Sequence, residues 1–376
     1  MSENLDDSGV GHFFSRLNPA GAELRTIDVV DATGLRFDFV ALSGAKGSLD
    51  DSLVAKGHGV FHIRMSVGGA RPLYSLMKRR KYRVVHSHLG VASGFVLAIA
   101  FVAGVPIRVA HFRSDGVGGK PAFAKKVLVK VSSVLVGLFA TDVVGVSPGA
   151  LEGSWKRNWR DDRRAVVIAN GLDYEALRVR AATSRAQRGD AVERLIVVNV
   201  GRVEETKNRG RAIRIWQEVA RTRPSTLLLV GQLNAADERQ VELTRATLGA
   251  DSEIVVFGDV TDVPVHYGSA HVLLVTSTRE GLPGVVLEAL ATGVAVVSSA
   301  LPGSIWIAGE VDGVTIRELD QPDDEWASAV VDAGSGSSAV IESSFERGPF
   351  VLAKIVPEFA RLWKLPQKPA APGGEL

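Results

Sequence analysis

Residues 272–299 read VLLVTSTREGLPGVVLEALATGVAVVSS, a pattern of strand, loop, helix and strand. The apolar runs at 271–275 and 294–297 predict two buried strands. Between them, 282–291 predicts a short helix with Pro283 in its first turn, where a missing N–H costs nothing. Such a unit places the positive end of the helix and its free backbone N–H groups at the top of a parallel sheet. We therefore expect this segment to bind an anion.

Two carboxylates flank the start of this helix. Glu280 lies in the loop, and Glu288 lies about two helical turns further along the chain. Gly281 and Gly284 let a ligand approach the backbone closely. Carboxylates repel phosphate but accept hydrogen bonds from sugar hydroxyls, which indicates a ligand with phosphate in the middle and polyols at both ends. A nucleoside diphosphate sugar has that shape. The alternative is that Glu288 is a solvated or salt-bridged residue on an ordinary helix face.

The whole segment, from Arg279 to the Ala-Thr-Gly at 291–293, resembles the E-x7-E motif of glycosyltransferase family 4. Members of this family are retaining enzymes of the GT-B fold that use nucleotide sugars. The resemblance implies an α/β protein of two doubly wound, Rossmann-like parallel-sheet domains that face a cleft. It assigns donor binding to Glu280, Gly281, Leu282, Pro283, Gly284 and Glu288, and it makes Glu280 a catalytic residue at the donor sugar.

A second motif follows the strand predicted at 195–200. The sequence GRVEETK at 201–207 places two cations in the loop that leaves this strand. Arg202 offers a planar fork to a diphosphate, and Lys207 offers a point charge. Alone, this is typical of a solvated basic loop. Beside the Glu280 segment it resembles the diphosphate clamp of the family, which implies that Arg202 and Lys207 bind the diphosphate and stabilise its charge as it departs.

In the first half, NPAGAE at 18–23 precedes a predicted helix. It resembles the glycine-rich Gly-Gly-Ala-Glu turn of the family, with Ala20 in place of the first glycine. The resemblance therefore assigns donor binding to Gly21. The alternative is a plain turn that starts a helix.

Histidines gather at the ends of two predicted strands. His86 and His88 lie two residues apart and so face the same side of their strand. A metal site would need further ligands, and the sequence has no matching set and no Asp-x-Asp, so we predict no metal and no cofactor beyond the nucleotide-sugar substrate. His111 resembles the active-site histidine that lies near the donor sugar in the family. His88 and Arg113 are assigned to the acceptor side.

Charge is distributed unevenly along the chain. Residues 1–172 carry 23 Lys and Arg against 14 Asp and Glu, a charge of +9, whereas 173–376 carry 21 against 28, a charge of −7. The basic first half indicates an anionic glycan or lipid-linked acceptor, or a neighbouring membrane surface. The run at 120–140 is either a basic amphipathic helix lying on lipid or, as we favour, a surface helix whose apolar face packs on the sheet. No nucleic-acid partner is expected, because the basic residues lack interleaved aromatics.

Cellular location is indicated by composition. The chain has no cysteine, and its first residues are polar and acidic, so we expect a cytoplasmic protein, either free or peripheral at the inner face of the cell membrane. The uncharged stretch at 89–107 is interrupted by Gly-Val-Pro at 104–106. It therefore predicts a buried helix followed by a strand rather than a membrane span.

Strand-like apolar runs alternate with helical segments in both halves, which predicts parallel sheets with helices on both faces. The polar segment at 178–193 separates the two sets of strands. The predicted organisation is an acceptor-side domain at 1–177, a linker at 178–193, a nucleotide-sugar-binding domain at 194–345, a helix that crosses back to the first domain at 346–365 and a disordered tail at 366–376.

The expected function is transfer of a sugar, with retention, from a UDP-sugar to a hydroxyl of a glycan or glycolipid. The segments 82–88 and 110–113 look most like enzymes of capsular and exopolysaccharide synthesis. The alternatives are a sugar-nucleotide epimerase of the same architecture and a non-catalytic nucleotide-sugar binder. A serine hydrolase is a remote third alternative. Ser147 fits the Gly-x-Ser-x-Gly nucleophile elbow, but Pro148 lacks the backbone N–H that such an elbow needs. Ser147 is better interpreted as a helix N-cap.

Overall fold

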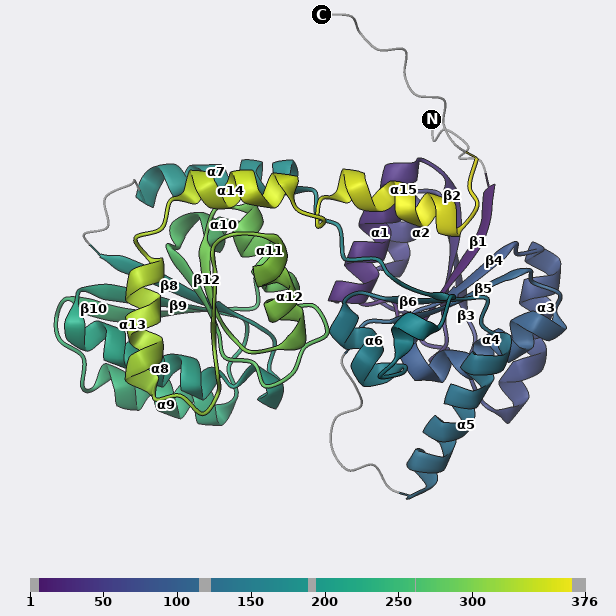
Figure 1. The fold of residues 1–376 in the computed structure, drawn as a ribbon, viewed down its shortest axis with the longest axis horizontal. Coiled ribbons are helices and arrows are strands. Elements are labelled where there is room, and N and C mark those ends of the chain that lie inside the picture. Colours follow the sequence, from purple (N-terminus) through teal and green to yellow (C-terminus); the bar gives the residue numbers. More distant parts are fainter. Residues whose placement is uncertain (1–6, 115–122, 189–193, 261, 367–376) are drawn as a thin grey trace, which may run out of the picture. The chain divides into compact units, whose positions relative to one another are not determined.

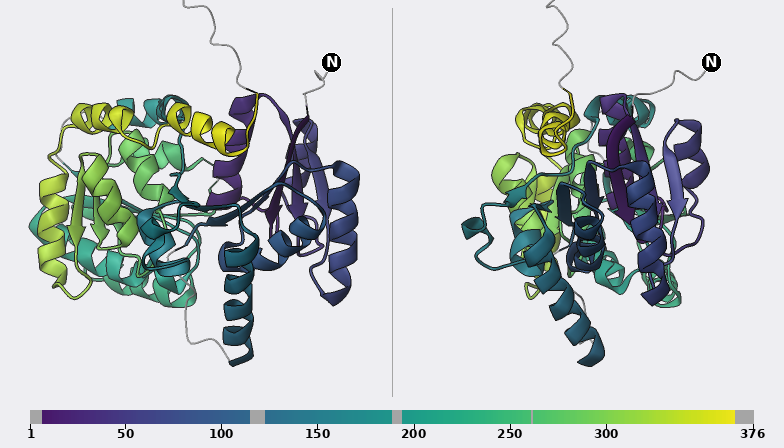
Figure 2. Two further views of the ribbon diagram at one scale, coloured as in Figure 1. Left: turned by 45° about the vertical axis from the view of Figure 1, so that its right-hand side comes forward. Right: turned by 90° about the vertical axis from the view of Figure 1, so that its right-hand side faces the viewer.

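The computed structural model describes residues 7–114, 123–188, 194–260 and 262–366. The described residues form two compact units. Unit 1 takes its residues from Met1–Val146, Leu151–Gly171 and Leu352–Leu376, and unit 2 from Ser147–Ala150 and Leu172–Val351. Each unit is a parallel sheet flanked by helices (Figure 1, Figure 2). The two doubly wound sheets predicted from the sequence are thus confirmed.

Unit 1 contains a seven-stranded sheet in the order β3-β2-β1-β4-β5-β6-β7. Every pairing in it is parallel. The strands are β1 (Asp7–Phe14), β2 (Arg36–Ala41), β3 (Gly59–His62), β4 (Val84–Ser87), β5 (Ile107–Phe112), β6 (Asp142–Gly145) and β7 (Ala165–Val167). Its helices are α1 (Gly21–Thr33), α2 (Asp50–Ala55), α3 (Ala70–Arg80), α4 (Ser93–Val102), α5 (Phe123–Phe139) and α15 (Leu352–Leu362), with 3-10 turns η1 (Val67–Gly69), η2 (Gly90–Ala92) and η3 (Trp159–Asp161). The short helix α6 (Pro148–Ser154) contains the boundary between the units.

Unit 2 contains a six-stranded parallel sheet in the order β10-β9-β8-β11-β12-β13. The strands are β8 (Leu195–Val200), β9 (Ser225–Val230), β10 (Ser252–Gly258), β11 (Val272–Val275), β12 (Ala295–Ser299) and β13 (Val314–Arg317). The helices are α7 (Tyr174–Arg188), α8 (Arg209–Thr222), α9 (Ala235–Arg245), α10 (Val263–Ser269), α11 (Gly284–Ala291), α12 (Pro302–Glu310), α13 (Asp323–Ala333) and α14 (Ser338–Arg347), with the 3-10 turn η4 (Glu205–Lys207).

The order of this second sheet positions the site. Strand β8 lies between β9 and β11, so the chain builds the sheet outward from β8 in both directions. In open parallel sheets, ligands bind beyond the carboxyl ends of the strands at such a switch point. The two motifs singled out in the sequence follow β8 and β11, which are neighbours in the sheet. The topology therefore brings them to one edge of unit 2.

Several local expectations differ from the structure. Residues 178–188, expected as part of a linker, belong to α7, which packs on α10, while 189–193 lie outside the described residues. The segment is polar but rich in Arg and Ala, which favour helix. Helix α11 begins at Gly284, because Pro283 keeps an extended backbone with ψ of 107° and serves as the N-cap. The predicted disordered tail falls almost wholly on 367–376, outside the described residues.

The carboxyl-terminal helix belongs to unit 1. Helix α15 packs against α1, and Trp363, just beyond its end, is 1% exposed. This helix is preceded by α14, a second helix that the sequence analysis did not predict. No helix in the described part of the chain is both long enough and apolar enough to cross a membrane.

Gly231 offers a test of the packing at the switch point. Its φ is +107°, and a Cβ there would lie 1.9 Å from the carbonyl oxygen of Gly201. We expect Gly231→Ala to lower the free energy of unfolding by about 1–3 kcal/mol or more, measured by urea denaturation. Gly249→Ala is the matched control, because a Cβ there meets no atom within 4 Å. Equal stability of the two variants would contradict the crowded geometry.

Candidate functional site

An ion pair joins the two motifs of unit 2. Lys207 Nζ lies 3.0 Å from Glu280 Oε1, and both side chains are mostly buried. Ser277 Oγ donates to the same carboxylate oxygen at 2.7 Å. The predicted residues Lys207 and Glu280, which lie far apart in the sequence, are thus brought together at the switch point of the sheet.

Backbone contacts fix the two loops that carry this pair. Thr276 Oγ1 donates to the carbonyl oxygen of Asn208 at 2.9 Å, and the N–H of Thr278 donates to the carbonyl of Thr206 at 2.8 Å. Asn208 has a φ of +51°, a left-handed conformation that Asn adopts more readily than most residues. The loops after β8 and β11 are therefore held against each other, and Lys207 and Glu280 are presented on a supported surface.

Arg202 lies apart from this pair. Its guanidinium contacts Glu204 at 3.1 Å, and its side chain is 71% exposed. A surface ion pair of this kind contributes little to stability, so its partner is easily exchanged. The structure thus places one predicted clamp cation at the switch point and leaves the other on the surface of the same loop.

Glu288 lies in α11, where the buried Tyr267 donates its hydroxyl to Oε2 at 3.1 Å. Before this helix, Leu282 is buried, and the carbonyl of Gly281 accepts a hydrogen bond from Ser147 Oγ at 2.8 Å. Ser147 also accepts from the N–H of Ala150 at 3.1 Å and is fully buried, as expected of an N-cap. Its hydroxyl is committed to a carbonyl, so the geometry does not support a serine nucleophile.

A buried arginine that the sequence analysis missed organises the strand ends of unit 2. Arg209 is 4% exposed and donates to four backbone carbonyls, those of Gly201, Val230, Gly231 and Gln232. Its Nε donates to Asn199 Oδ1 at 3.2 Å. Burial lowers the pKa of Arg209, and the carboxylate of Asp237 opposes that shift. One signal was present in the sequence: a cation in the first turn of a helix opposes the helix dipole and indicates that other groups hold it.

Unit 1 contains a cluster of four histidines. His12 of β1 pairs in register with His86 of β4, and His88 and His111 lie beside them at the ends of β4 and β5. His12, His86 and His111 are at most 1% exposed, and His88 is half-buried. His86 and His88 come from β4 and its end, and His12 and His111 come from the two strands that pair with β4, so parallel pairing stacks the rings.

Hydrogen bonds give this cluster a direction. The indole N–H of Trp363 donates to His86 Nδ1 at 2.9 Å, and Arg113 Nε donates to His88 Nδ1 at 3.2 Å. A neutral imidazole carries one proton, and because Nδ1 accepts in both rings, that proton lies on Nε2. His86 Nε2 therefore donates to His111 Nδ1, and His88 Nε2 donates to His12 Nδ1, each at 3.0 Å. Both chains end on a buried Nε2, of His111 and His12, that has no hydrogen-bond partner among the described residues.

The electrostatics keep these rings neutral. Burial, together with the charge of the neighbouring Arg113, lowers the pKa of His12 to about 3. Burial also lowers the pKa values of His86, His88 and His111 well below 6.5. The ligand atoms of His12, His86 and His88 lie within 4.8 Å of one another, as in a metal site. Apart from Nε2 of His12, the nitrogens of these three residues already bond to one another or to His111, Trp363 and Arg113. The guanidinium of Arg113 opposes a cation, so the donor set fits a hydrogen-bonded cluster better than a metal.

Arg113 joins the cluster to the surrounding helices. Its guanidinium donates to Asn170 Oδ1 at 3.1 Å and to Thr26 Oγ1 of α1 at 2.8 Å. Burial lowers the pKa of Arg113 to about 10, against the opposing charge of Glu23, so the group stays cationic at neutral pH. Gly21 is the first residue of α1, exposed, with open space where a Cβ would lie. The structure thus brings His88 together with His111 and Arg113, and His111 is buried rather than open to a ligand.

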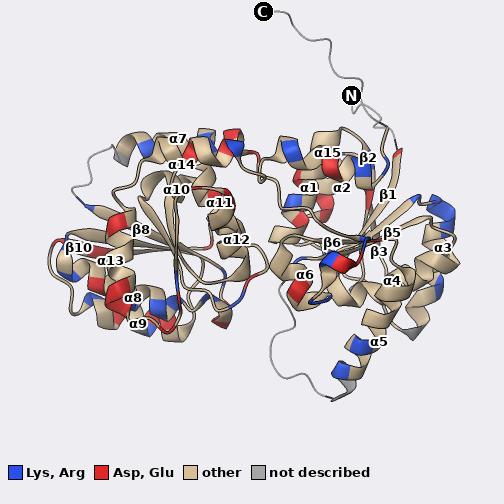
Figure 3. Cartoon of the chain, viewed as in Figure 1, with Lys and Arg blue, Asp and Glu red and all other residues tan. Residues whose placement is uncertain are grey.

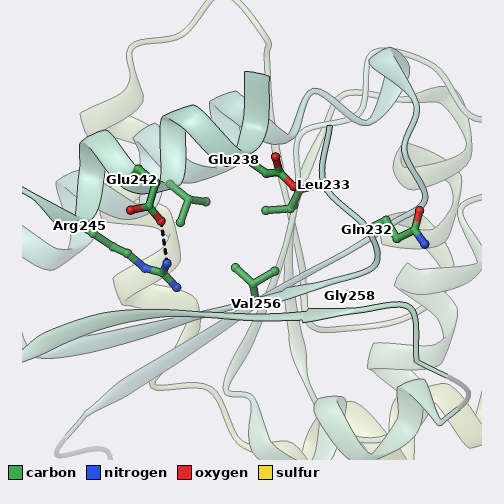
Figure 4. Close-up of a pocket in the computed structure, with 8 residues that line it drawn as sticks. Gln232, Leu233, Glu238, Glu242, Arg245, Val256 and Gly258 are labelled. Carbon is green, nitrogen blue, oxygen red and sulfur yellow. Dashed lines mark hydrogen bonds and ion pairs between the residues drawn. The ribbon is translucent and has the colours of Figure 1, made fainter. Parts of the chain in front are cut away.

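A separate hollow of about 430 Å³ lies between α9 and β10 (Figure 4). None of the predicted site residues lines it. Its walls include the ion pair of Glu242 and Arg245, with Val256 of β10 opposite and Glu238 at the side. It is set on an edge strand, whereas the Lys207–Glu280 pair follows the two central strands.

Beyond Arg209, the sequence analysis missed two residues that hold the predicted ones. Ser277 donates to Glu280, and Tyr267 donates to Glu288. The Thr-Ser-Thr run at 276–278, directly after a buried strand, was a usable signal for the first. For Tyr267, a lone tyrosine in the helix before β11, the sequence offered none.

Comparison with known proteins identifies the family of the second unit. Residues 194–334 match the model of the glycosyl transferases group 1. A relative from Staphylococcus aureus, the capsular polysaccharide biosynthesis glycosyltransferase CapH, is 28% identical over 302 residues, covering 77% of this chain and 81% of the relative. An Escherichia coli UDP-Gal:α-D-GlcNAc-diphosphoundecaprenol α-1,3-galactosyltransferase is 24% identical over 260 residues, 66% of each chain. The resemblance to capsular and exopolysaccharide glycosyltransferases is confirmed.

The fold is shared with solved structures. HepE from Anabaena, crystallised in complex with UDP, superposes with a TM-score of 0.75 at 16% identity, covering 94% of this chain and 99% of that one. The expected GT-B architecture of two Rossmann-like sheets is confirmed by this match and by the two parallel sheets.

The neutral histidines of unit 1 predict a loss of stability in mild acid. The folded pKa of His12 is about 3, against about 6.5 when unfolded, so between these values only the unfolded chain binds the proton. The free energy of unfolding is therefore highest above pH 6.5 and decreases as the pH falls below this value. His12 alone contributes a loss of about 1.4 kcal/mol at pH 5.5, with the other buried histidines acting in the same direction.

Urea unfolding at pH 7.5 and 5.5 measures this loss. The control is His12→Phe, which keeps an aromatic ring beside Phe37 and Phe39. This variant should show a smaller difference in unfolding free energy between the two pH values. Equal unfolding free energies of the wild type at the two pH values would show that the rings are not held neutral.

Proposed function

Because residues 194–334 belong to the glycosyl transferases of group 1, we propose that the protein transfers a sugar from a nucleoside diphosphate sugar to a hydroxyl group of an acceptor. UDP is the proposed nucleotide, in line with the UDP complex of the HepE structure and the UDP-Gal donor in the name of the E. coli relative. The proposed acceptor is a glycan or lipid-linked glycan of cell-surface polysaccharide synthesis, as the name of CapH suggests.

The observation that carries this proposal is the Lys207–Glu280 pair at the switch point of unit 2. A lysine against the loop that leads into α11 provides positive charge for a diphosphate, and the carboxylate beside it provides an acceptor for sugar hydroxyls. Without ligand, each of these groups neutralises the other. A nucleotide sugar replaces one ion pair by two sets of contacts, with phosphate on the lysine and hydroxyls on Glu280.

Donor binding then proceeds by exchange of partners. Lys207 leaves Glu280 for the diphosphate, and Arg202 leaves Glu204 to join it. The backbone from Gly281 to Gly284, including Leu282 and Pro283, offers N–H groups at the helix start. Glu288, oriented by Tyr267, accepts from the ribose hydroxyls. In this proposal the two cations and the helix start stabilise the departing diphosphate, so that no metal ion and no cofactor is needed.

Unit 1 supplies the acceptor side. We assign His88 and Arg113 to the acceptor, Gly21 to a close approach of the donor at the start of α1, and His111 to the donor sugar. His111 is 1% exposed, so its contact with a sugar requires the side chains that cover it to move. Retention of the anomeric configuration is part of the proposal, and an NMR spectrum of the product checks it. We also propose a cytoplasmic location at the inner face of the membrane.

Product analysis separates this function from its alternatives. Incubation with UDP-sugar alone should give at most slow hydrolysis, and a glycan acceptor should give a glycosylated product together with UDP. A changed sugar in the absence of acceptor would identify an epimerase. Binding of UDP without any turnover would identify a non-catalytic binder.

Lys207→Ala tests the diphosphate contact. Removing one preorganised donor at the site of developing charge typically lowers the rate by about 10²–10³. We therefore expect this variant to lose nearly all transfer in a steady-state assay, while its melting temperature stays near that of the wild type. The control is Arg214→Ala, which removes an exposed cation of α8 that pairs with Asp323. Near-normal turnover in Lys207→Ala would rule out the clamp.

Glu288→Gln tests the ribose contact. Loss of a charge-assisted hydrogen bond of about 1.5–3 kcal/mol should weaken UDP binding about ten- to a hundredfold in calorimetric titration. Glu238→Gln, on the wall of the α9–β10 hollow, is the control and should titrate like the wild type. The reverse result, with binding lost only in Glu238→Gln, would move the nucleotide site to that hollow.

A further inference from the structure

Helix α5 of unit 1 carries an apolar stripe that faces solvent. Val127, Val131, Val134 and Leu138 are 48%, 45%, 55% and 69% exposed. Their spacing of four, three and four residues puts them on one face of the helix. Single exposed apolar residues are ordinary on a protein surface, but a continuous stripe over three helical turns is not.

The opposite face of α5 is already packed. Ser132 and Val136, which lie across the helix from the stripe, are 2% and 0% exposed, and Ser132 Oγ donates to the carbonyl of Val91 at 2.7 Å. Helix α5 packs on α4 through this side. The interpretation favoured from the sequence, an ordinary surface helix with its apolar face inward, therefore accounts for only some of the apolar residues. The stripe remains uncovered by the described residues.

Exposed apolar residues also lie at the end of α4, which packs on α5. Phe101 and Val102 are 53% and 72% exposed, and the ring of Phe101 lies 5.1 Å from that of Phe139 in α5. The amino-terminal half of α5 extends beyond the other elements of its unit (Figure 1, Figure 2). We call Phe101, Val102, Val127, Val131, Val134 and Leu138 the α4–α5 surface.

The charge beside this surface has one sign. Residues 116–141 contain four lysines and no acidic residue. Lys126 and Lys130, one turn apart along the edge of the stripe, are both exposed, and α5 shows only basic charge (Figure 3). A second copy of the chain on the same face would bring these lysines against each other, which disfavours a symmetric dimer. A partner that offers both apolar volume and negative charge fits instead.

We propose that the α4–α5 surface docks on the anionic face of a lipid bilayer, with α5 lying in the plane of the interface. The apolar stripe enters the boundary between headgroups and acyl chains, while Lys126 and Lys130 contact lipid phosphates. The docking depends on the proposed location at the membrane, to which it adds the residues that make the contact. It would hold the enzyme beside an acceptor that is itself anchored in lipid.

Vesicle sedimentation tests the proposal with the full chain and no nucleotide. Binding is expected to vesicles of phosphatidylglycerol and phosphatidylcholine, to fall as salt is added, and to be much weaker on phosphatidylcholine alone. Val131→Asp combined with Val134→Asp should weaken binding about tenfold or more, because two apolar side chains no longer enter the interface. Lys126→Glu with Lys130→Glu should weaken it by a similar factor and reduce the salt dependence.

Matched controls come from exposed residues elsewhere. Val179→Asp and Val340→Asp, at positions 75% and 55% exposed in unit 2, and Lys78→Glu on α3 should bind vesicles like the wild type. A UDP thermal shift, recorded on every variant, separates this surface from the donor site. Absent vesicle binding with an intact UDP shift would overturn the docking surface alone. A dimer in solution that Val131→Asp dissociates would assign the surface to a second copy and overturn the lipid proposal.

Discussion

The guanidinium of Arg209 is the group on which the site of unit 2 depends. Among the described residues no carboxylate forms an ion pair with it, and it is instead surrounded by four carbonyl oxygens from the ends of β8 and β9. A buried charge is tolerated only when hydrogen bonds replace its hydration, and each such bond contributes about 1.5–3 kcal/mol. Asn199 accepts from Arg209 and donates to the carbonyl of Leu274 in β11. One cation thus aligns the three strand ends from which the Lys207 and Glu280 loops depart.

The elements that the sequence predicted best are those that the sheet buries on both faces. Strand β8 has the expected bounds at both ends, and β11 begins one residue later than expected, because central parallel strands are continuous apolar runs. Lys207 and Glu280, singled out in two separate motifs, meet in the structure because the carboxyl ends of neighbouring parallel strands lie at one edge. What each residue binds stays a prediction, while the family comparison supports the kind of ligand.

The missed features depend on contacts that cross the sequence. Strand β1 begins with polar residues at Asp7, and β13 at the sheet edge is only half-buried, so neither shows a clear apolar run. The four histidines come together only when the order β1-β4-β5 is known, which their positions in the sequence do not reveal. Trp363, from the far end of the chain, then sets the direction of one of their hydrogen-bond chains. For α5 the sequence left contact with lipid and packing on the sheet as alternatives, because periodicity identifies an apolar face without telling what covers it.

The most direct test of the central claim is a crystal structure of the protein with UDP bound. The account predicts that the diphosphate lies at the start of α11, that Lys207 Nζ has left Glu280 for a phosphate oxygen, and that Glu288 accepts from the ribose hydroxyls. UDP in the hollow between α9 and β10, with the 3.0 Å pair of Lys207 and Glu280 unchanged, would contradict it.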